Sequence, residues 1–386
     1  TIASSSYSAS GIAPEDHQAF DLMVAMSADF LQFEELGIAE QGNHGFDAWL
    51  RSEDTHEARE LQTWLDECER IGTSDVLDTL IQMPGFVDRF GTGPLISYVF
   101  IEPYSALRNA ARVEWYRAQK ALVIGDTEVA IQSAIRQLGV ARLYLNQPIA
   151  IHRLMGHAVL AMGLQLTRDI VYNGVTQEQH AILTAAVGSI NLRDMQNVYQ
   201  GEFLIAADTI VRTFPSNFTI RTISRGAQYH RVSSEFERMQ AWSSKSVRER
   251  IESPYVESPE DWRYVSADIL LPGVDALERS HDQIRVELEG IKLILAIEDA
   301  RIRTGRLPDS LAEIVPEYLS AIPIDPFSPE SSAYKYSLNE TSHFGYNLYS
   351  VGHDGVDDGG VAPQGVPQYA LAAGYEGTDY IFTRSE

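Results

Sequence analysis

Hydrophobic residues recur at helical spacing through roughly the first 250 residues, and Gly, Pro and Asn residues interrupt the pattern. The spacing predicts helices over 14–35, 47–71, 74–83, 104–124, 126–145, 147–173, 176–190 and 194–214. A turn at Gly125 and Asp126 joins two of them into a helical hairpin. The second helix of this hairpin has a stripe of small and apolar residues that lets two backbones approach closely: Ala130, Ala134, Leu138 and Ala141. Helical pairs without a repeating consensus predict a helical-repeat arrangement, either solenoid-like or an irregular bundle.

The pattern changes after Gly273. The segment 275–305 is a long helical pattern with an apolar stripe at Ile284, Leu288, Ile291 and Leu295. Three short segments that are rich in Tyr, Phe or Ile and bounded by turn residues then predict strands: 334–337, 345–350 and 379–383. We therefore expect one long helix laid across a small antiparallel sheet.

These patterns together predict an α+β protein with three consecutive parts. A mainly α-helical domain is expected over 1–214, and the helix-on-sheet module over 273–386. Between them, 215–272 contains four prolines and a polar helical segment around 233–250. This composition predicts a linker region with one exposed helix.

Charge and cysteine content exclude several classes of function. Lys and Arg total 30 against 54 Asp and Glu, which gives a formal net charge of −24. Such an acidic chain is not expected to bind nucleic acid. The one cysteine, Cys68, excludes an intrachain disulfide and a cysteine-based zinc site. The apolar run at 288–297 is too short to span a membrane, and the first ten residues lack the features of a signal peptide, so neither element is expected.

The C-terminal residues resemble a known family. The succession AIEDARIRTGRLPDSLAEIVPEYLSAIPIDPFSP, FGYNLYSVGHDGVDDGG and GTDYIF, within 285–386, resembles the periplasmic part of the major pseudopilins of type II secretion. The segments EWYRAQKALVIGDTEVAIQSAIRQLGVAR and YQGEFLIAADTI resemble uncharacterised planctomycete-type helical proteins that carry such a module. The resemblance implies a bacterial, extracytoplasmic protein, at the cell surface, in the periplasm or secreted. A pseudopilin carries its membrane-embedded helix at the N-terminus, whereas the corresponding helix here is internal and charged, so assembly by that route is not expected.

The densest group of chemistry-bearing residues is HDGVDDGG at 353–360, which contains Asp354, Asp357 and Asp358. Crowded carboxylates in a glycine-rich loop are typical of sites for Ca²⁺, which prefers six to eight oxygen ligands. The resemblance to pseudopilins adds Ser350 and Asp354 as calcium ligands, and it adds Asp379 as the first of two acids before the last strand. Tyr380 replaces the second acid, and Asp357 or Asp358 would have to substitute for it. The alternative interpretation is a solvated acidic turn.

Three functions remain open. A non-catalytic structural or interaction protein that engages other proteins, including copies of itself, agrees with the absence of a G-x-S-x-G or Walker A motif. A hydrolytic enzyme would place its site in the helical domain near His152, His157 and Glu202. For these residues we favour packed histidines and a structural ion pair between Glu202 and Arg212 or another base. The third alternative is a subunit of a surface layer or filament.

Overall fold

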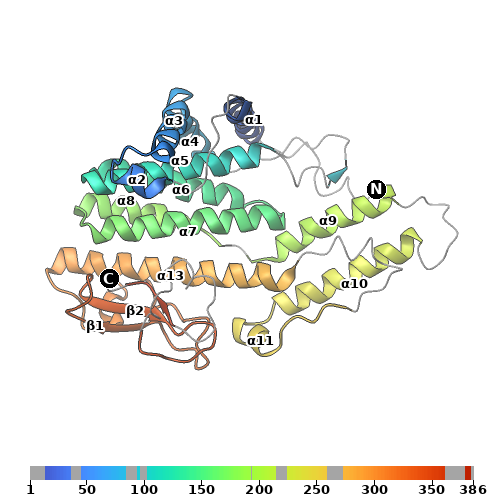
Figure 1. Cartoon of the computed structure of the whole chain (residues 1–386). Helices are drawn as coiled ribbons and strands as arrows, with labels where there is room; N and C mark the ends of the chain where they lie inside the picture. Colours follow the sequence, from blue (N-terminus) through green and yellow to red (C-terminus); the bar gives the residue numbers. More distant parts are fainter. Residues whose placement is uncertain are drawn as a thin grey trace. The chain divides into compact units, whose positions relative to one another are not determined.

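The computed structural model describes residues 14–35, 45–83, 94–95, 102–192, 194–213, 224–258, 273–360 and 379–383 (Figure 1). The contacts divide the chain into two compact units. The first contains Thr1–Leu166, Asn197–Ser233 and Asp261–Leu271, and the second contains Thr167–Gln196, Ser234–Glu260 and Pro272–Glu386. The expected boundaries at 214 and 272 divide the chain into consecutive parts. The two units instead group segments that are far apart in sequence, and the boundaries after Leu166 and after Ser233 fall inside helices.

The first unit is helical in its described part. Its elements are α1 (Pro14–Glu35), α2 (Phe46–Leu50), α3 (His56–Arg70), α4 (Thr73–Leu80), α5 (Glu102–Ile124), α6 (Thr127–Leu145), most of α7 (Ala150–Tyr172) and of α9 (Gln196–Thr213), and the first part of α10 (Arg225–Ser243). Helices α5 and α6 form the predicted hairpin, with Gly125 and Asp126 as its turn, and lie side by side in both figures. The predicted stripe on α6 is confirmed, because Ala130, Ala134, Leu138 and Ala141 are all buried.

The prediction of one helix over 47–71 is wrong. The chain leaves the helical path after Leu50, and Ser52 adopts a positive φ of 60°. A new helix then begins at His56, where the hydroxyl of Thr55 accepts a hydrogen bond from the backbone N–H of Ala58. This N-terminal cap replaces hydrogen bonds that a continuous helix would have made, so the break costs little.

The second unit is organised around helix α13 (Val274–Thr304), which is packed against α8 (Gln177–Gly188). The predicted stripe is confirmed, since Ile284, Leu288, Ile291 and Leu295 are at most 4% exposed. The unit also contains α11 (Val247–Glu252) and a short 3₁₀ helix at Leu311–Ile314. The described part of 215–272 differs from the expected single exposed helix, because 224–258 forms both α10 and α11, and Phe236, Met239 and Trp242 of α10 are buried.

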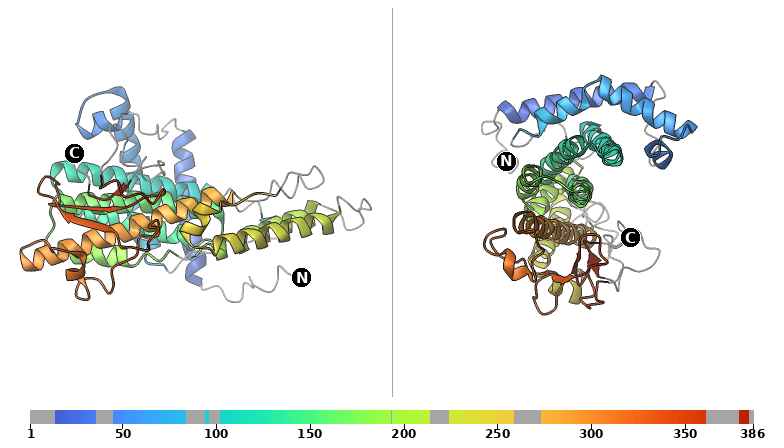
Figure 2. Two further views of the ribbon diagram at one scale, coloured as in Figure 1. Left: turned by 90° about the horizontal axis from the view of Figure 1, so that it is seen from below. Right: turned by 90° about the vertical axis from the view of Figure 1, so that its left-hand side faces the viewer.

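The predicted sheet is confirmed as a small antiparallel sheet in the order β1–β2–β3. Its strands are β1 (Lys335–Leu338), β2 (Tyr346–Ser350) and β3 (Tyr380–Ile381). Figure 2 shows the sheet alongside α13. Gly290 allows the close approach, because a Cβ atom there would lie 2.2 Å from a ring carbon of Phe382. The protein is therefore α+β, as predicted. Within the described residues, no helix is both long and apolar enough to cross a membrane.

Candidate metal-binding loop at the sheet edge

A buried carboxylate that the sequence analysis did not identify holds the start of the acidic loop. Asp325 is 1% exposed, and its two carboxylate oxygens accept hydrogen bonds from the Ser350 hydroxyl and the Val351 backbone N–H, both at 2.9 Å. The backbone N–H of Phe327 adds a third bond at 3.0 Å. Burial raises the pKa of the Asp325 carboxyl, although these hydrogen-bond donors act to lower it. Asp325 thereby fixes the point at which the chain leaves β2 and enters the loop.

This arrangement changes the role of Ser350. Its hydroxyl donates to Asp325 and accepts a hydrogen bond of 3.3 Å from the backbone N–H of Gly352. Ser350 is fully buried and its hydroxyl serves as a loop anchor. The only sequence signal for its partner was an aspartate before a proline in the segment AIPIDPFSP.

Asp379, just before β3, is the most unusual carboxylate of the loop region. It is 0% exposed, and its Oδ2 atom accepts a hydrogen bond of 2.7 Å from the backbone N–H of Gly360. Its Oδ1 atom is buried and has no hydrogen-bond donor among the described residues. Burial raises the pKa of Asp379, and the negative charges of Asp357 and Asp358 raise it further. The backbone N–H groups of Gly360 and Asp358 lower this pKa but do not outweigh burial. The fold thus brings three of the five expected ligands within electrostatic reach of one another.

Asp357 is held in place by its neighbours. Its Oδ1 atom accepts hydrogen bonds from the Tyr349 hydroxyl at 3.0 Å and from the Gly359 backbone N–H at 3.1 Å. Its Oδ2 atom lies 3.3 Å from Nζ of Lys335. The limited burial of Asp357 opposes ionisation, but these donors prevail and lower its pKa. Asp357 is therefore an ionised carboxylate next to the buried Asp379.

Asp354 and Tyr380 have other partners. Asp354 accepts a hydrogen bond of 3.0 Å from the backbone N–H of Val356, two residues along its own loop. Tyr380 forms a side-chain hydrogen bond with Glu287 of α13, so the residue that replaces the second acid contacts the helix. In the described part of the chain, no group of three or more His, Cys, Asp or Glu side chains has the closeness that a metal ion requires. The residues 361–378, between the loop and β3, lie outside the described residues.

Gly360 is required for this geometry. Its φ is +70°, and a Cβ atom would lie 2.7 Å from a ring carbon of Tyr349. A side chain at this position would therefore push the backbone N–H of Gly360 away from Asp379.

The residues of the enzymatic alternative have structural partners. His152 is fully buried and stacks on Tyr104 with ring centroids 3.7 Å apart, and burial lowers its pKa to about 4. Glu202 Oε1 accepts a hydrogen bond of 2.6 Å from the backbone N–H of Ala150, the first residue of α7. The expected ion pair of Glu202 with Arg212 or another base is not seen among the described contacts: Arg212 contacts Asp208 at 2.8 Å, and the N-terminus of α7 provides the partner of Glu202. The third residue, His157, is also buried, as favoured.

Comparison of the chain with protein-family models, with curated proteins and with solved structures gives no significant match.

Proposed function

We propose that residues 273–386 are a pseudopilin-like module in which Ca²⁺ fastens the loop at 351–360 to strand β3. We further propose that the protein is a non-catalytic, extracytoplasmic structural or interaction protein. One observation carries the calcium proposal. The buried Oδ1 atom of Asp379 has no hydrogen-bond donor among the described residues, and two further carboxylates lie within electrostatic reach. Backbone N–H groups of Gly360 and Asp358 satisfy this carboxylate only in part. A buried carboxylate that is not fully satisfied is costly, and a bound cation would reduce that cost.

The donor set suits a hard cation. Asp379 and Asp358 would supply carboxylate oxygens, and Asp357 would do so by exchanging its contact with Lys335 for the cation. Asp354 is a fourth carboxylate of the same loop. In the proposed site, backbone carbonyl oxygens of the glycine-rich loop would complete the set. Sets of carboxylate, carbonyl and water oxygens are the preference of Ca²⁺, while thiolates and imidazoles would favour transition metals. Ser350 is not included, because its hydroxyl is committed to Asp325.

The extracytoplasmic and interaction roles depend on less direct support. The order of helix, turn, acidic loop and final strand follows the resemblance to the periplasmic part of the major pseudopilins. Calcium sites in extracellular modules commonly bind with dissociation constants on the order of 10⁻⁴–10⁻³ M, which is adequate where calcium is abundant. At a free Ca²⁺ concentration about 100 times Kd, binding would stabilise the folded state by about 2.7 kcal/mol.

Thermal unfolding tests the calcium proposal. The melting temperature of the full chain is measured in a calcium chelator, in Ca²⁺ and in Mg²⁺ at equal ionic strength. We expect Ca²⁺ to raise the melting temperature more than Mg²⁺ does, because Mg²⁺ demands a stricter octahedral geometry. Asp309→Asn is the matched control, since the Asp309 side chain is 77% exposed in the same unit, and it should respond like the wild type. Identical melting curves in Ca²⁺ and chelator would exclude the site.

A further inference from the structure

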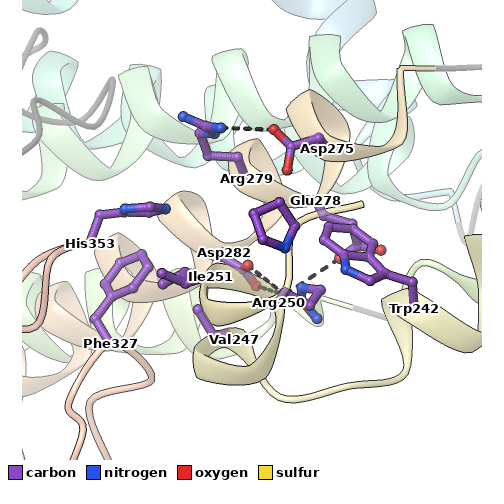
Figure 3. A pocket seen from close by; sticks show the side chains of 11 residues that line it. Trp242, Val247, Arg250, Ile251, Asp275, Glu278, Arg279, Asp282, Phe327 and His353 are labelled. Carbon is purple, nitrogen blue, oxygen red and sulfur yellow. Dashed lines mark hydrogen bonds and ion pairs between the residues drawn. The ribbon is translucent and has the colours of Figure 1, made fainter. Parts of the chain in front are cut away.

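A small pocket lies between helix α11, the first turns of α13 and the acidic loop, all within the second unit (Figure 3). Val247 and Ile251 of α11 line it together with Phe327, and His353 extends into the lining from the loop. Its volume is about 100 Å³. Because close-packed interiors resist rearrangement, this space gives the side chains at the contact room for more than one arrangement.

The acidic loop touches α11 with its backbone. Gly355 has a φ of +71°, and a Cβ atom there would lie 2.9 Å from Nη1 of Arg248 on α11. The same Cβ atom would lie 2.9 Å from Cγ of Pro329. A residue with a side chain would therefore separate the loop from α11, and glycine permits the contact.

Contacts with the rest of the unit alternate with the expected calcium ligands along this loop. The ring centroid of His353 lies 6.0 Å from that of Phe327. Asp354 comes next, then the contact at Gly355, and Asp357 follows two residues later. Since at most one residue separates a ligand from a contact, a shift of the ligands moves the contacts.

Two buried polar groups at the loop are incompletely satisfied. Nη2 of Arg248 donates a hydrogen bond of 3.3 Å to Glu252, but its Nε and Nη1 atoms are buried and have no acceptor among the described residues. The buried Oδ1 atom of Asp379 has no donor in the same part of the chain. Each unsatisfied group lowers stability, so an arrangement of the loop that satisfies both is favoured over one that satisfies neither.

Trp242 senses the position of α11. Arg250 of α11 donates from Nη2 to both carboxylate oxygens of Asp282, which ties the helix to α13. The Arg250 guanidinium lies 5.7 Å from the centre of the Trp242 ring. The Nε1–H of Trp242 donates a hydrogen bond of 2.8 Å to the carbonyl of Ser253, the residue that follows α11. Trp242 is 7% exposed, so a displacement of α11 changes its environment.

We propose that calcium binding at the loop is coupled to the packing of α11, with Arg248 as the residue that positions the loop from the side of the helix. The loop is held on Arg248 more firmly when calcium is bound, and the docked loop binds calcium more tightly. The inference rests on the proposed calcium site and adds its regulation. Coupling is reciprocal, so α11 loosens when calcium leaves. Helix α11 precedes the segment 285–386 that resembles pseudopilins, so calcium acts on a part of the chain outside that resemblance.

The test follows calcium binding to the full chain by calorimetry and the position of α11 by tryptophan fluorescence. In the wild type, the fluorescence of Trp242 should change with the same midpoint as calcium binding. The Trp242→Phe variant is the blank that separates this signal from the other four tryptophans. Saturating calcium should also slow amide hydrogen exchange in α11 about fivefold or more.

The Arg248→Gln variant separates the coupling from simple electrostatics. Removal of a positive charge near a cation site increases calcium affinity if charge alone matters. The coupling predicts the opposite result, which is calcium binding about fivefold weaker or worse and loss of the Trp242 response. Arg306→Gln is the matched control, because the Arg306 side chain is 60% exposed in the same unit and lies outside the pocket lining. It should bind calcium at least as tightly as the wild type and keep the Trp242 response.

The Gly355→Ala variant tests the same contact from the side of the loop. Its added Cβ atom displaces the loop from Arg248, and calcium binding should weaken about fivefold or more. Circular dichroism establishes that each variant is folded, and the two wild-type measurements need no variant.

Two results would overturn the coupling and leave the calcium site intact. One is a wild-type chain that binds calcium without a change in Trp242 fluorescence or in the hydrogen exchange of α11. The other is a folded Arg248→Gln variant that binds calcium as tightly as the wild type, or more tightly. A wild-type chain that gives no binding heat with calcium would overturn both the calcium proposal and the coupling.

Discussion

The Asp379→Asn substitution should have opposite effects on the melting temperature, relative to the wild type, in chelator and in calcium. The substitution neutralises the buried carboxylate, keeps its shape, and retains an oxygen that accepts the hydrogen bond from Gly360. Without calcium, it removes a buried charge whose ionisation is opposed by burial and by the charges of Asp357 and Asp358. Relieving a buried, unsatisfied polar group is worth about 1–3 kcal/mol. In chelator the variant should therefore melt at the same temperature as the wild type or a few degrees higher.

In calcium the order should be the opposite. A stabilisation of about 2.7 kcal/mol at 100 times Kd corresponds to about 5–10 °C for a folding unit of 150–250 residues. The wild type gains this increment, and the variant, which lacks the central ligand, does not. The assay is calorimetric melting of wild type, Asp379→Asn and the control Asp309→Asn, each with and without Ca²⁺. If Asp379→Asn lowered the melting temperature equally in both conditions, Asp379 would be a structural residue and the metal argument would be refuted.

Three further predictions concern the packing around this loop. Burial raises the pKa of Glu287 from 4.5 to about 7, so the contribution of Glu287 to stability is present below pH 4.5 and is lost as the pH rises through 7. The Glu287→Gln variant should therefore have the same melting temperature as the wild type at pH 4 and a higher one at pH 8. A difference in melting temperature that is the same at both pH values would contradict this assignment. Gly290→Ala should cost about 1–3 kcal/mol in urea unfolding, because the added Cβ overlaps the Phe382 ring, and an unchanged midpoint would show that the helix and strand are not so close. Asp325→Ala should cost about 2–4 kcal/mol and speed amide hydrogen exchange at Val351, and exchange as slow as in the wild type would refute its anchoring role.

The sequence was sufficient to predict the elements whose stabilising contacts are local or periodic. The stripe on α13 follows from burial on one face, so Leu288 is found where the pattern places it. Strand β2 lies within the segment 345–350, which was predicted as a strand from its aromatic residues and bounding turns. The break between α2 and α3 was missed although residues 51–57 are all polar, because the apolar positions Trp49 and Leu61 on either side of it were assigned to one helix. A single capping residue, Thr55, and a positive φ at Ser52 decide that break, and neither changes the hydrophobic periodicity.

The calcium site stays a prediction, and the structure bears on the contacts of its expected ligands. The charges of Asp357 and Asp358 raise the pKa of Asp379, whereas Ser350 is committed to Asp325, which is 25 residues away in sequence. The cluster around Arg250 was missed for the same reason, because Asp282 lies 32 residues further along the chain. Contacts between residues so far apart depend on tertiary packing, which local sequence patterns do not encode.

Equilibrium dialysis against calcium tests the central claim most directly. The account predicts one Ca²⁺ bound by each wild-type chain and by Asp309→Asn, and none bound by Asp379→Asn at the same free concentration. A wild-type chain that binds no Ca²⁺ at millimolar concentration, or an Asp379→Asn chain that binds it equally well, would contradict the account.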